Sequence, residues 1–249
     1  MDKSMIEYWE GSRMWDEDDD RLFSCSIIND ASLAFPKGVW EMLDESFDSF
    51  KGQIILVPSC GDGICALGFS LLKAIVMATD FREKIVKQVK DKSHEYGLSI
   101  EGKTLNSQDL TDEPSNKYDL VFTSYGVLSC MTKKADLEMM FESFHRVLKP
   151  GGRYILFDYH PSTEVFSKIL IDESNENHLE YQKKLEINKP YWEVHWRTED
   201  YLRTLIKLGF ALVDFREIRA DLNDIPIYRR RTYISNAFPS WIGINAKKR

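Results

Sequence analysis

Short apolar runs recur along the chain and are separated by longer amphipathic stretches. The stretches predicted to be strands are 53–58 (QIILVP), 74–79 (AIVMAT), 99–105, 118–123 (YDLVFT), 153–158 (RYILFD), 211–218 and 241–246 (WIGINA). Between them, apolar residues spaced as on one helix face predict helices over 64–72, 81–96, 133–148 and 198–208. Strands that alternate with helices indicate crossover connections. The pattern therefore predicts an α/β, Rossmann-like fold with a mostly parallel seven-stranded sheet and helices on both faces.

Glycine, proline and threonine mark the ends of the predicted helices. Gly97 is predicted to close the helix before it as a left-handed C-cap, and Gly209 to stop the helix over 198–208. Thr198 is expected to cap the start of that last helix. The segment Lys149–Gly152 (KPGG) cannot continue a helix, so we expect a turn there.

The regular alternation begins near residue 51 and is interrupted once. It predicts a domain over 51–249, preceded by a separate N-terminal segment over 1–50. The stretch 161–196 breaks the pattern and is predicted to be an insertion. Both additions contain many aromatic residues, so we expect them to form a small cap over the strand ends. The acidic run 16–20 is expected to be a solvated surface turn.

The charge balance and the cysteines exclude several classes of partner. The chain has 33 basic and 40 acidic side chains and a formal net charge of −7, whereas phosphate backbones favour dense lysine and arginine. We therefore expect no nucleic-acid partner. No secretory signal or membrane span is visible, so we expect a cytoplasmic protein, monomeric or homodimeric, without membrane contact. The four cysteines lack zinc-type spacing, so we expect free thiols and no metal site.

Candidate ligand-binding residues follow the first two predicted strands. In an open α/β sheet, ligands bind beyond the carboxyl ends of the strands. The turn 59–63 (SCGDG) lies at such an end, and its small residues allow a ligand to approach the backbone closely. An ordinary strand-to-helix turn is the alternative. Asp80 ends the second strand, where a carboxylate can accept both hydroxyls of a ribose, although it could also cap the helix that follows.

Polar residues also follow the third and fourth strands. Asn106, Ser107 and Asp109 come just after the third strand, where they could contact an adenine edge. A plain polar loop would have the same composition. The segment 123–128 (TSYGVL) follows the fourth strand, and KPGG precedes the fifth. Together these two segments favour the ligand-binding interpretation.

The stretches 118–128 (YDLVFTSYGVL) and 144–158 (FHRVLKPGGRYILFD) are the most specific part of the sequence. With the glycine turn and Asp80, they resemble the class I S-adenosylmethionine (SAM)-dependent methyltransferase superfamily, in its small-molecule branch of methyltransferase types 11 and 25. The resemblance runs from about residue 50 to the C-terminus. It implies the strand order 3-2-1-4-5-7-6 with the last strand antiparallel, SAM as the cofactor, and methyl transfer to a small-molecule acceptor.

The resemblance also implies roles for individual residues. Asp80 would bind the ribose, and Phe81 would pack on the adenine. The loop near the methionine part of SAM would comprise Ser59, Gly61 and Gly63. Residues near the adenine amino group would be Asn106, Ser107 and Asp109, and those lining the methyl-transfer face would be Thr123 and Tyr125.

Two positions differ from the family pattern, and two other functions remain open. Val57 stands where an acidic residue is usual, and Ser59 stands at the first glycine position. A nicotinamide-dependent oxidoreductase shares the acidic ribose ligand, but Ala66 occupies the third position of its glycine pattern. The KPGG segment and an antiparallel last strand favour the methyltransferase. A non-catalytic SAM-binding or interaction protein could keep the same fold.

Methyl transfer requires the nucleophile, the methyl group and the sulfur to be in line, in a site closed to water. Aromatic residues of the cap are candidates for lining an acceptor pocket, with packing of the cap's own core as the alternative. A hydroxyl or ammonium acceptor requires a general base. Candidate bases are His160 after the fifth strand, His195 in the insertion, and Tyr125. A structural histidine is the alternative for the first two, and Asp158 could orient His160.

Overall fold

The computed structural model describes the chain over residues 6–7, 9–10, 17–124, 126–161, 196–219, 221 and 239–249. Two candidate site residues, Tyr125 and His195, lie outside the described residues, as does most of the predicted insertion. Within the described ranges, every helix is too short or too polar to cross a membrane.

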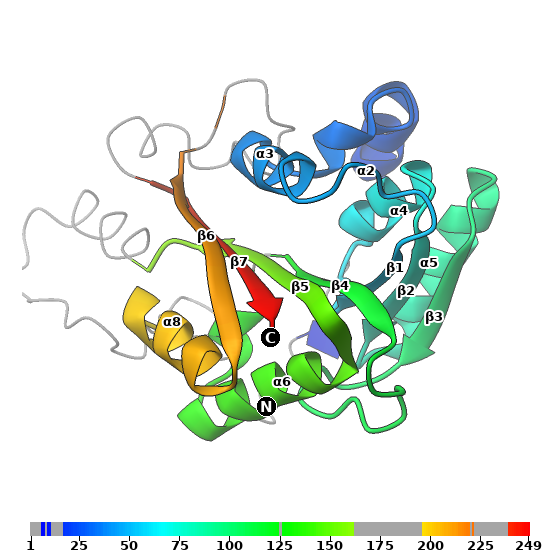
Figure 1. Ribbon diagram of the computed structural model, residues 1–249. Coiled ribbons are helices and arrows are strands. Elements are labelled where there is room, and N and C mark those ends of the chain that lie inside the picture. The colour runs from blue at the N-terminus through cyan, green and yellow to red at the C-terminus, as the bar shows by residue number, and fades with distance from the viewer. Residues whose placement is uncertain are drawn as a thin grey trace, which may run out of the picture.

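Seven strands form one sheet in the order β3-β2-β1-β4-β5-β7-β6. Their bounds are β1 Ile54–Pro58, β2 Ile75–Asp80, β3 Ile100–Thr104, β4 Tyr118–Thr123, β5 Leu148–Tyr159, β6 Phe210–Ile218 and β7 Trp241–Lys248. Neighbouring strands are parallel from β3 to β5, whereas β7 runs antiparallel to both β5 and β6. The predicted order and the reversed last strand are confirmed. The carboxyl ends of the six other strands therefore meet at one edge of the sheet (Figure 1).

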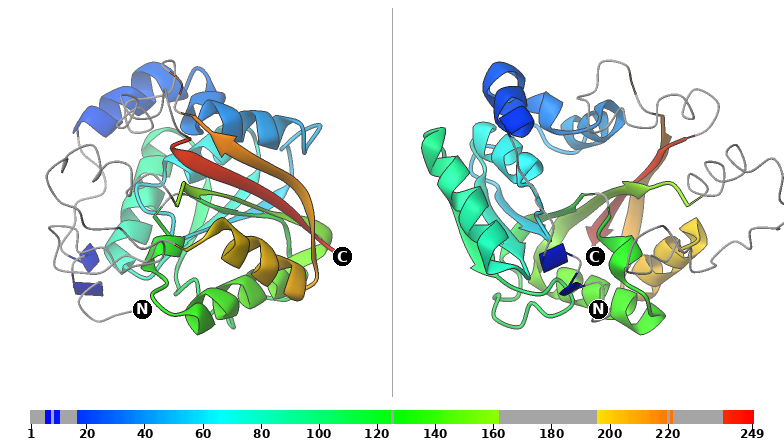
Figure 2. Two further views of the ribbon diagram at one scale, coloured as in Figure 1. Left: turned by 90° about the vertical axis from the view of Figure 1, so that its left-hand side faces the viewer. Right: turned by 180° about the vertical axis from the view of Figure 1, so that it is seen from behind.

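Helices cover both faces of the sheet, as its apolar strands require. The helices on one face are α3 (Lys37–Asp44), α4 (Ile64–Leu71) and α5 (Glu83–Glu95), and those on the other are α6 (Lys134–Val147) and α8 (Thr198–Lys207) (Figure 1, Figure 2). Successive side chains of a strand point to opposite faces. Val57 therefore packs in the core that α3, α4 and α5 cover, while Leu56 packs in the core that α6 and α8 cover.

The N-terminal segment packs against the main body of the fold. It contains α2 (Glu17–Leu22), the π-helical turn η1 (Phe23–Ile27) and the 3-10 turn η2 (Ala31–Ala34). Phe23 and Phe35 are buried in the same core as β1 and β4. Ala34 lies so close to α4 that a Cβ added at Gly68 would be 2.4 Å from its side chain. Residues 23–44 thus cover one face of the sheet, whereas we predicted a cap over the strand ends.

The acidic run 16–20 is not a surface turn over its described part. From Glu17 onward it forms the start of α2. Asp20 of this helix accepts a hydrogen bond from Lys92 of α5 at 2.6 Å. This contact between Asp20 and α5 depends on the tertiary structure, and the composition of the run did not reveal it.

The glycines end their helices as predicted, but the KPGG segment differs from the prediction. Gly97 and Gly209 have φ values of 65° and 92°, which is the left-handed conformation expected of helix C-caps. Lys149–Gly152, expected as a turn, is part of β5. This strand begins at Leu148, which pairs with Tyr118 of β4 before an irregularity in the register. α6 therefore passes directly into β5. Pairing with β4 satisfies backbone hydrogen-bonding groups that a turn would leave exposed to water.

The starts of two helices also differ from the predictions. α5 has Arg82 at its N-cap position, so Asp80 does not cap it. α8 has Arg197 at its N-cap position and begins at Thr198, and no side-chain cap bond forms there. In both cases the predicted cap residue is present but displaced along the chain from the capping position.

Candidate cofactor and active site

The loop between β1 and α4 turns sharply beside the carboxyl end of β2. Ser59, Gly61 and Gly63 all have left-handed backbone conformations, with φ values of 51°, 54° and 84°. The N–H of Cys60 donates to the carbonyl of Thr79 at 2.8 Å, which holds the loop against β2. Glycine adopts such conformations without steric cost, so Ser59 is the strained member of the three. The loop presents a curved backbone of small residues at the predicted ligand-binding edge.

Cys60 of this loop is buried and unreactive. Burial raises the pKa of its thiol well above the ordinary value, and the nearby carboxylates of Asp80 and Asp62 raise it further. The thiol therefore stays protonated at neutral pH, and it is not a candidate nucleophile because the thiolate is the reactive form.

Asp80 ends β2, and only 2% of this residue is exposed. Its Oδ1 accepts from the backbone N–H of Arg82 at 3.1 Å and from Arg82 Nε at 2.9 Å. Its Oδ2 accepts from the N–H of Gly61 at 3.3 Å and from Arg82 Nη2 at 3.3 Å. This one carboxylate therefore joins the glycine loop, the end of β2 and the start of α5.

Arg82 is a residue of this site that the sequence analysis missed. It is 6% exposed, and its Nη1 donates to the carbonyl of Trp9 at 2.9 Å. Its guanidinium carbon lies 5.8 Å from the ring centroid of Trp9 and 5.3 Å from that of Phe81. Phe81, which the resemblance places on the adenine, is half-buried beside this arginine. A basic residue two positions after the expected ribose carboxylate was the sequence signal that could have found it.

The predicted adenine-contact residues lie in the loop after β3 and point in different directions. Ser107 is buried, and its Oγ lies 2.6 Å from Ser59 Oγ, so it contacts the glycine loop directly. Asn106 is exposed, and its side chain forms hydrogen bonds within its own loop. Asp109 is exposed too, and hydrogen bonds from Thr111 lower the pKa of its carboxyl. Of these three residues, Ser107 alone forms a side-chain hydrogen bond with the glycine loop in the part of the chain that the structure describes.

The end of β4 contributes a buried hydroxyl and a tightly held loop. Thr123 is 1% exposed, and its Oγ1 lies 2.9 Å from Tyr154 Oη. This hydroxyl is engaged in the core, whereas we predicted that the side chain lines the methyl-transfer face. Asp158, near the end of β5, accepts the backbone N–H groups of Gly126 at 2.8 Å and Leu128 at 3.0 Å. The Asp158 carboxylate therefore fixes the loop that follows β4.

His160 follows β5 at the same edge and pairs with a carboxylate of β6. Its Nε2 lies 3.1 Å from Glu217 Oε1, and its backbone N–H donates to the carbonyl of Ser240 at 2.9 Å. His160 is 9% exposed, whereas the Glu217 side chain is 58% exposed. The sequence offers Asp158 as a group that could orient this histidine, whereas in the structure Glu217 pairs with its ring. The two residues are 57 positions apart, so no local pattern links them.

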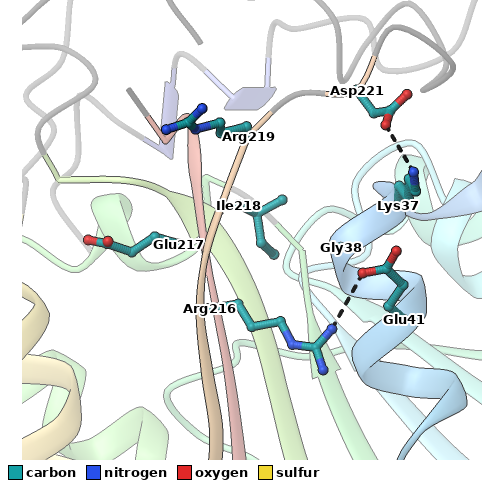
Figure 3. A pocket seen from close by; sticks show the side chains of 8 residues that line it. All are labelled: Lys37, Gly38, Glu41, Arg216, Glu217, Ile218, Arg219 and Asp221. Carbon is teal, nitrogen blue, oxygen red and sulfur yellow. Dashed lines mark hydrogen bonds and ion pairs between the residues drawn. The ribbon is translucent and has the colours of Figure 1, made fainter. Parts of the chain in front are cut away.

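A groove of about 500 Å³ opens between the start of α3 and the end of β6 (Figure 3). Two ion pairs cross it: Arg216 Nη1 lies 3.6 Å from Glu41 Oε2, and Lys37 Nζ lies 3.3 Å from Asp221 Oδ2. Figure 3 shows Arg216 pointing toward α3 and Glu217 pointing to the opposite side of β6. The residues lining the groove are Lys37, Gly38, Glu41, Arg216, Glu217, Ile218, Arg219 and Asp221. Because charged side chains dominate its walls, the groove is poorly suited to an apolar ligand.

Four of the predicted cofactor residues, Ser59, Gly61, Asp80 and Ser107, lie together at one part of the edge, and His160 lies at another. Direct hydrogen bonds join Ser59 to Ser107 and Gly61 to Asp80. Neighbouring strands lie about 4.8 Å apart, so the ends of β2 and β5, three strands apart, are separated by roughly 14 Å. A ligand held at Asp80 would have to extend along the edge to approach His160.

This chain is similar to known proteins in the sequence of this region, and it is similar to solved structures in its fold. Residues 55–152 match a family model described as "Methyltransferase domain". The chain is 30% identical over 124 residues to the ubiquinone/menaquinone biosynthesis C-methyltransferase UbiE of Pseudoalteromonas translucida, a match that covers 47% of each protein. It is 27% identical over 105 residues to the ubiquinone biosynthesis O-methyltransferase of Pseudomonas syringae pv. tomato, covering 42% of this chain and 44% of that one. The chain thus spans about half the length of the curated relatives it matches.

A solved structure extends the likeness to most of the chain. The S-adenosylmethionine-dependent methyltransferase from Mesorhizobium loti superimposes with a TM-score of 0.59 at 18% sequence identity. The superposition covers 89% of this chain and 100% of that one. At this identity the likeness shows the fold alone. The family match is independent of it and contains the glycine loop, Asp80 and the end of β4.

Proposed function

We propose that this chain is a class I SAM-dependent methyltransferase that transfers a methyl group from SAM to a small-molecule acceptor; the match of residues 55–152 to a methyltransferase domain supports this. The observation that carries this proposal is the junction at Asp80. There, the buried carboxylate at the end of β2 accepts a hydrogen bond from the backbone N–H of Gly61, in the glycine loop at the end of β1. Such a junction lies where α/β sheets bind nucleotide-like ligands.

The residues at this junction fit the parts of SAM. Asp80 has an acceptor oxygen for each hydroxyl of a ribose. The left-handed backbone of the 59–63 loop allows close approach of the methionine part, because its side chains are small. We propose that Phe81 packs on the adenine and that Ser107, which contacts Ser59, lies near the adenine edge. Asn106 and Asp109 remain candidates for the same edge, from an exposed position.

SAM supplies a methyl group on a positively charged sulfur. A nucleophile attacks the methyl carbon, and the sulfur leaves. The chain's contribution to such a reaction is mainly positioning, because the nucleophile must approach in line. Asp158 serves this purpose by holding two backbone N–H groups of the loop after β4. We propose that this loop, together with Tyr125, forms the wall beside the reacting atoms, whereas Thr123 ends β4 with its hydroxyl engaged in the core.

We propose His160 as the general base for an acceptor that must lose a proton. An ionised carboxylate accepts hydrogen bonds, so Glu217 at 3.1 Å favours the tautomer that carries the proton on Nε2. In that tautomer Nδ1 is the ring atom that can take a proton. Glu217 would also stabilise the imidazolium that forms. His195 stays a second candidate base.

The small-molecule class of the acceptor is supported by the relatives and by the charge. Both relatives are named for steps in quinone biosynthesis, and this chain is acidic, which disfavours nucleic acid. Not every aromatic residue of the predicted cap is available to line an acceptor pocket. Trp196 is 8% exposed in the core beside α6 and α8, where its Nε1 donates to the Met131 carbonyl at 2.9 Å. Trp9, by contrast, lies at the cofactor edge beside Arg82.

Titration calorimetry with SAM, with its demethylated product S-adenosylhomocysteine and with NAD tests the proposal. We expect the first two to bind and NAD not to bind. Asp80→Ala should weaken S-adenosylhomocysteine binding by about 5- to 150-fold, because it removes two hydrogen bonds worth together about 1–3 kcal/mol. Asp112→Ala, at an exposed carboxylate of the β3–β4 connection, is the matched control and should leave the dissociation constant unchanged. Binding of NAD alone would assign the site to an oxidoreductase.

A further inference from the structure

The carboxylate of Asp80 has no acceptor position left over. Each carboxylate oxygen offers two lone pairs, about four acceptor positions in all. Oδ1 accepts from the Arg82 N–H and Nε, and Oδ2 accepts from the Gly61 N–H and Arg82 Nη2. A ribose can therefore bind Asp80 through both hydroxyls only if donors of the chain give way.

The donors that can give way are those of the Arg82 side chain. The N–H groups of Gly61 and Arg82 belong to the backbone of the glycine loop and of the turn before α5, which the fold holds in place. Nε and Nη2 of Arg82 sit on a long side chain with several rotatable bonds. They take one position on each carboxylate oxygen, at 2.9 and 3.3 Å. That is the pattern in which the two hydroxyls of a ribose would bind.

We propose that the Arg82 side chain is an internal competitor of the cofactor, so that binding of an adenosyl ligand displaces its guanidinium from Asp80. This inference rests on the proposed function, because it takes the ribose as the ligand of Asp80. It adds a residue that lowers the cofactor affinity and gives the Asp80 site a second arrangement. The guanidinium is buried in a bidentate pair, a strong form of ion pair, so exchanging it for a ribose consumes part of the binding free energy.

The same arginine links Asp80 to the N-terminal segment. Its Nη1 donates to the Trp9 carbonyl at 2.9 Å, and its guanidinium carbon lies 5.8 Å from the Trp9 ring. Lys84, the second residue of α5, donates to the carbonyl of Glu10. Residues 9–10 are thus held beside the carboxyl edge by two basic side chains, only one of which also contacts Asp80. A ligand that displaces Arg82 from Asp80 therefore loosens residues 9–10, and the two events are coupled.

A positioning role for Arg82 makes the opposite prediction. If the arginine stays in place and merely aims the carboxylate at the ribose, its removal weakens cofactor binding. If it competes with the ribose, its removal strengthens binding. The sign of the change in affinity therefore decides between the two roles.

The test measures S-adenosylhomocysteine binding to the full chain by calorimetry for the wild type, Arg82→Met and Lys84→Met. Methionine keeps the apolar stem of the arginine and removes its donors. We expect Arg82→Met to bind about tenfold more tightly, the scale set by losing competing hydrogen bonds to a charged group. Lys84→Met is the comparison variant, because it removes a neighbouring basic side chain without touching Asp80. It weakens only the hold on residues 9–10, so its affinity should rise by clearly less than that of Arg82→Met. Circular dichroism melts verify that each variant is folded.

Hydrogen exchange of short peptides that contain residues 9–10 gives a second measurement. In the wild type, saturating S-adenosylhomocysteine should increase exchange in these peptides, whereas in Arg82→Met exchange should already be high and should not respond. Equal or weaker binding by Arg82→Met, or N-terminal exchange that falls with ligand in the wild type, overturns the inference. If neither protein binds S-adenosylhomocysteine, the proposed function fails and the inference fails with it. Weaker binding by Arg82→Met alone leaves the proposed function intact.

Discussion

Glu113 offers a sharp test of how charge stabilises the connection between β3 and β4. Its side chain is fully buried, at 0% exposure. It accepts hydrogen bonds from Lys103, from Lys117 at 3.0 Å and from the hydroxyl of Tyr118. Burial of the carboxyl would raise its pKa, but these three bonds outweigh it and lower the pKa from 4.5 to about 2. Replacing this residue by glutamine, Glu113→Gln, keeps the shape and removes the charge.

The size and sign of the effect follow from the shift in pKa. A pKa lowered by about 2.5 units corresponds to at most about 3 kcal/mol of stability at neutral pH. Because the Lys103 and Lys117 side chains are 43% and 30% exposed, solvent screening reduces this to about 2 kcal/mol. The folded pKa lies below the unfolded one, so this stability is fully present above pH 4.5 and is lost as the pH falls toward 2.

Urea denaturation of the wild type and Glu113→Gln at several pH values measures the effect. We expect the free energy of unfolding to differ by about 2 kcal/mol at pH 7 and by less than about 1 kcal/mol at pH 3. Glu142→Gln, at an exposed position of α6, is the control, and its difference from the wild type should be small at every pH. A Glu113→Gln difference that stays constant between pH 7 and pH 3 would refute the reasoning.

Three further substitutions test the site. Gly63→Ala should lower the unfolding free energy by about 1–3 kcal/mol in urea denaturation, since φ is 84° and the new Cβ would lie 2.6 Å from Val89. Gly97→Ala, with φ of 65° and open space around it, should cost less; an equal cost would show that the Val89 contact is immaterial. Asp158→Asn should destabilise by about 1–3 kcal/mol, because one of two loop N–H groups loses its acceptor; unchanged stability contradicts this. His160→Gln should slow methyl transfer to a hydroxyl or ammonium acceptor by about 100-fold at unchanged cofactor affinity, and an unaltered rate excludes it as the base.

The order of elements could be predicted from the sequence, and so could the edge at which we propose the cofactor site. In runs such as 54–58 and 118–123, consecutive side chains are apolar, so both faces of the strand must be buried. Such runs therefore form inner strands of a sheet that is covered on both sides. Asp80 and the 59–63 loop follow two adjacent strands, and parallel strands bring their carboxyl ends to one edge. These inferences use only spacing along the chain, which the fold preserves.

Side-chain partnerships depended on the tertiary structure. The sequence shows Arg82 beside Asp80, but only packing of the N-terminal segment reveals that Trp9 holds the arginine from the other side. Likewise, His160 follows β5 and Glu217 lies near the end of β6. Because β7 runs antiparallel to both strands, their carboxyl ends lie at the same edge, where the two side chains meet.

The sequence by itself therefore determined the mostly parallel sheet, its helices and the edge at which we propose that a nucleotide-like ligand binds, because periodicity and burial act locally along the chain. Only the tertiary structure decided which donors occupy the Asp80 carboxylate and which carboxylate faces His160. The physical reason is that hydrogen bonds between distant segments depend on distances of a few tenths of an ångström, which strand order and helix packing set together.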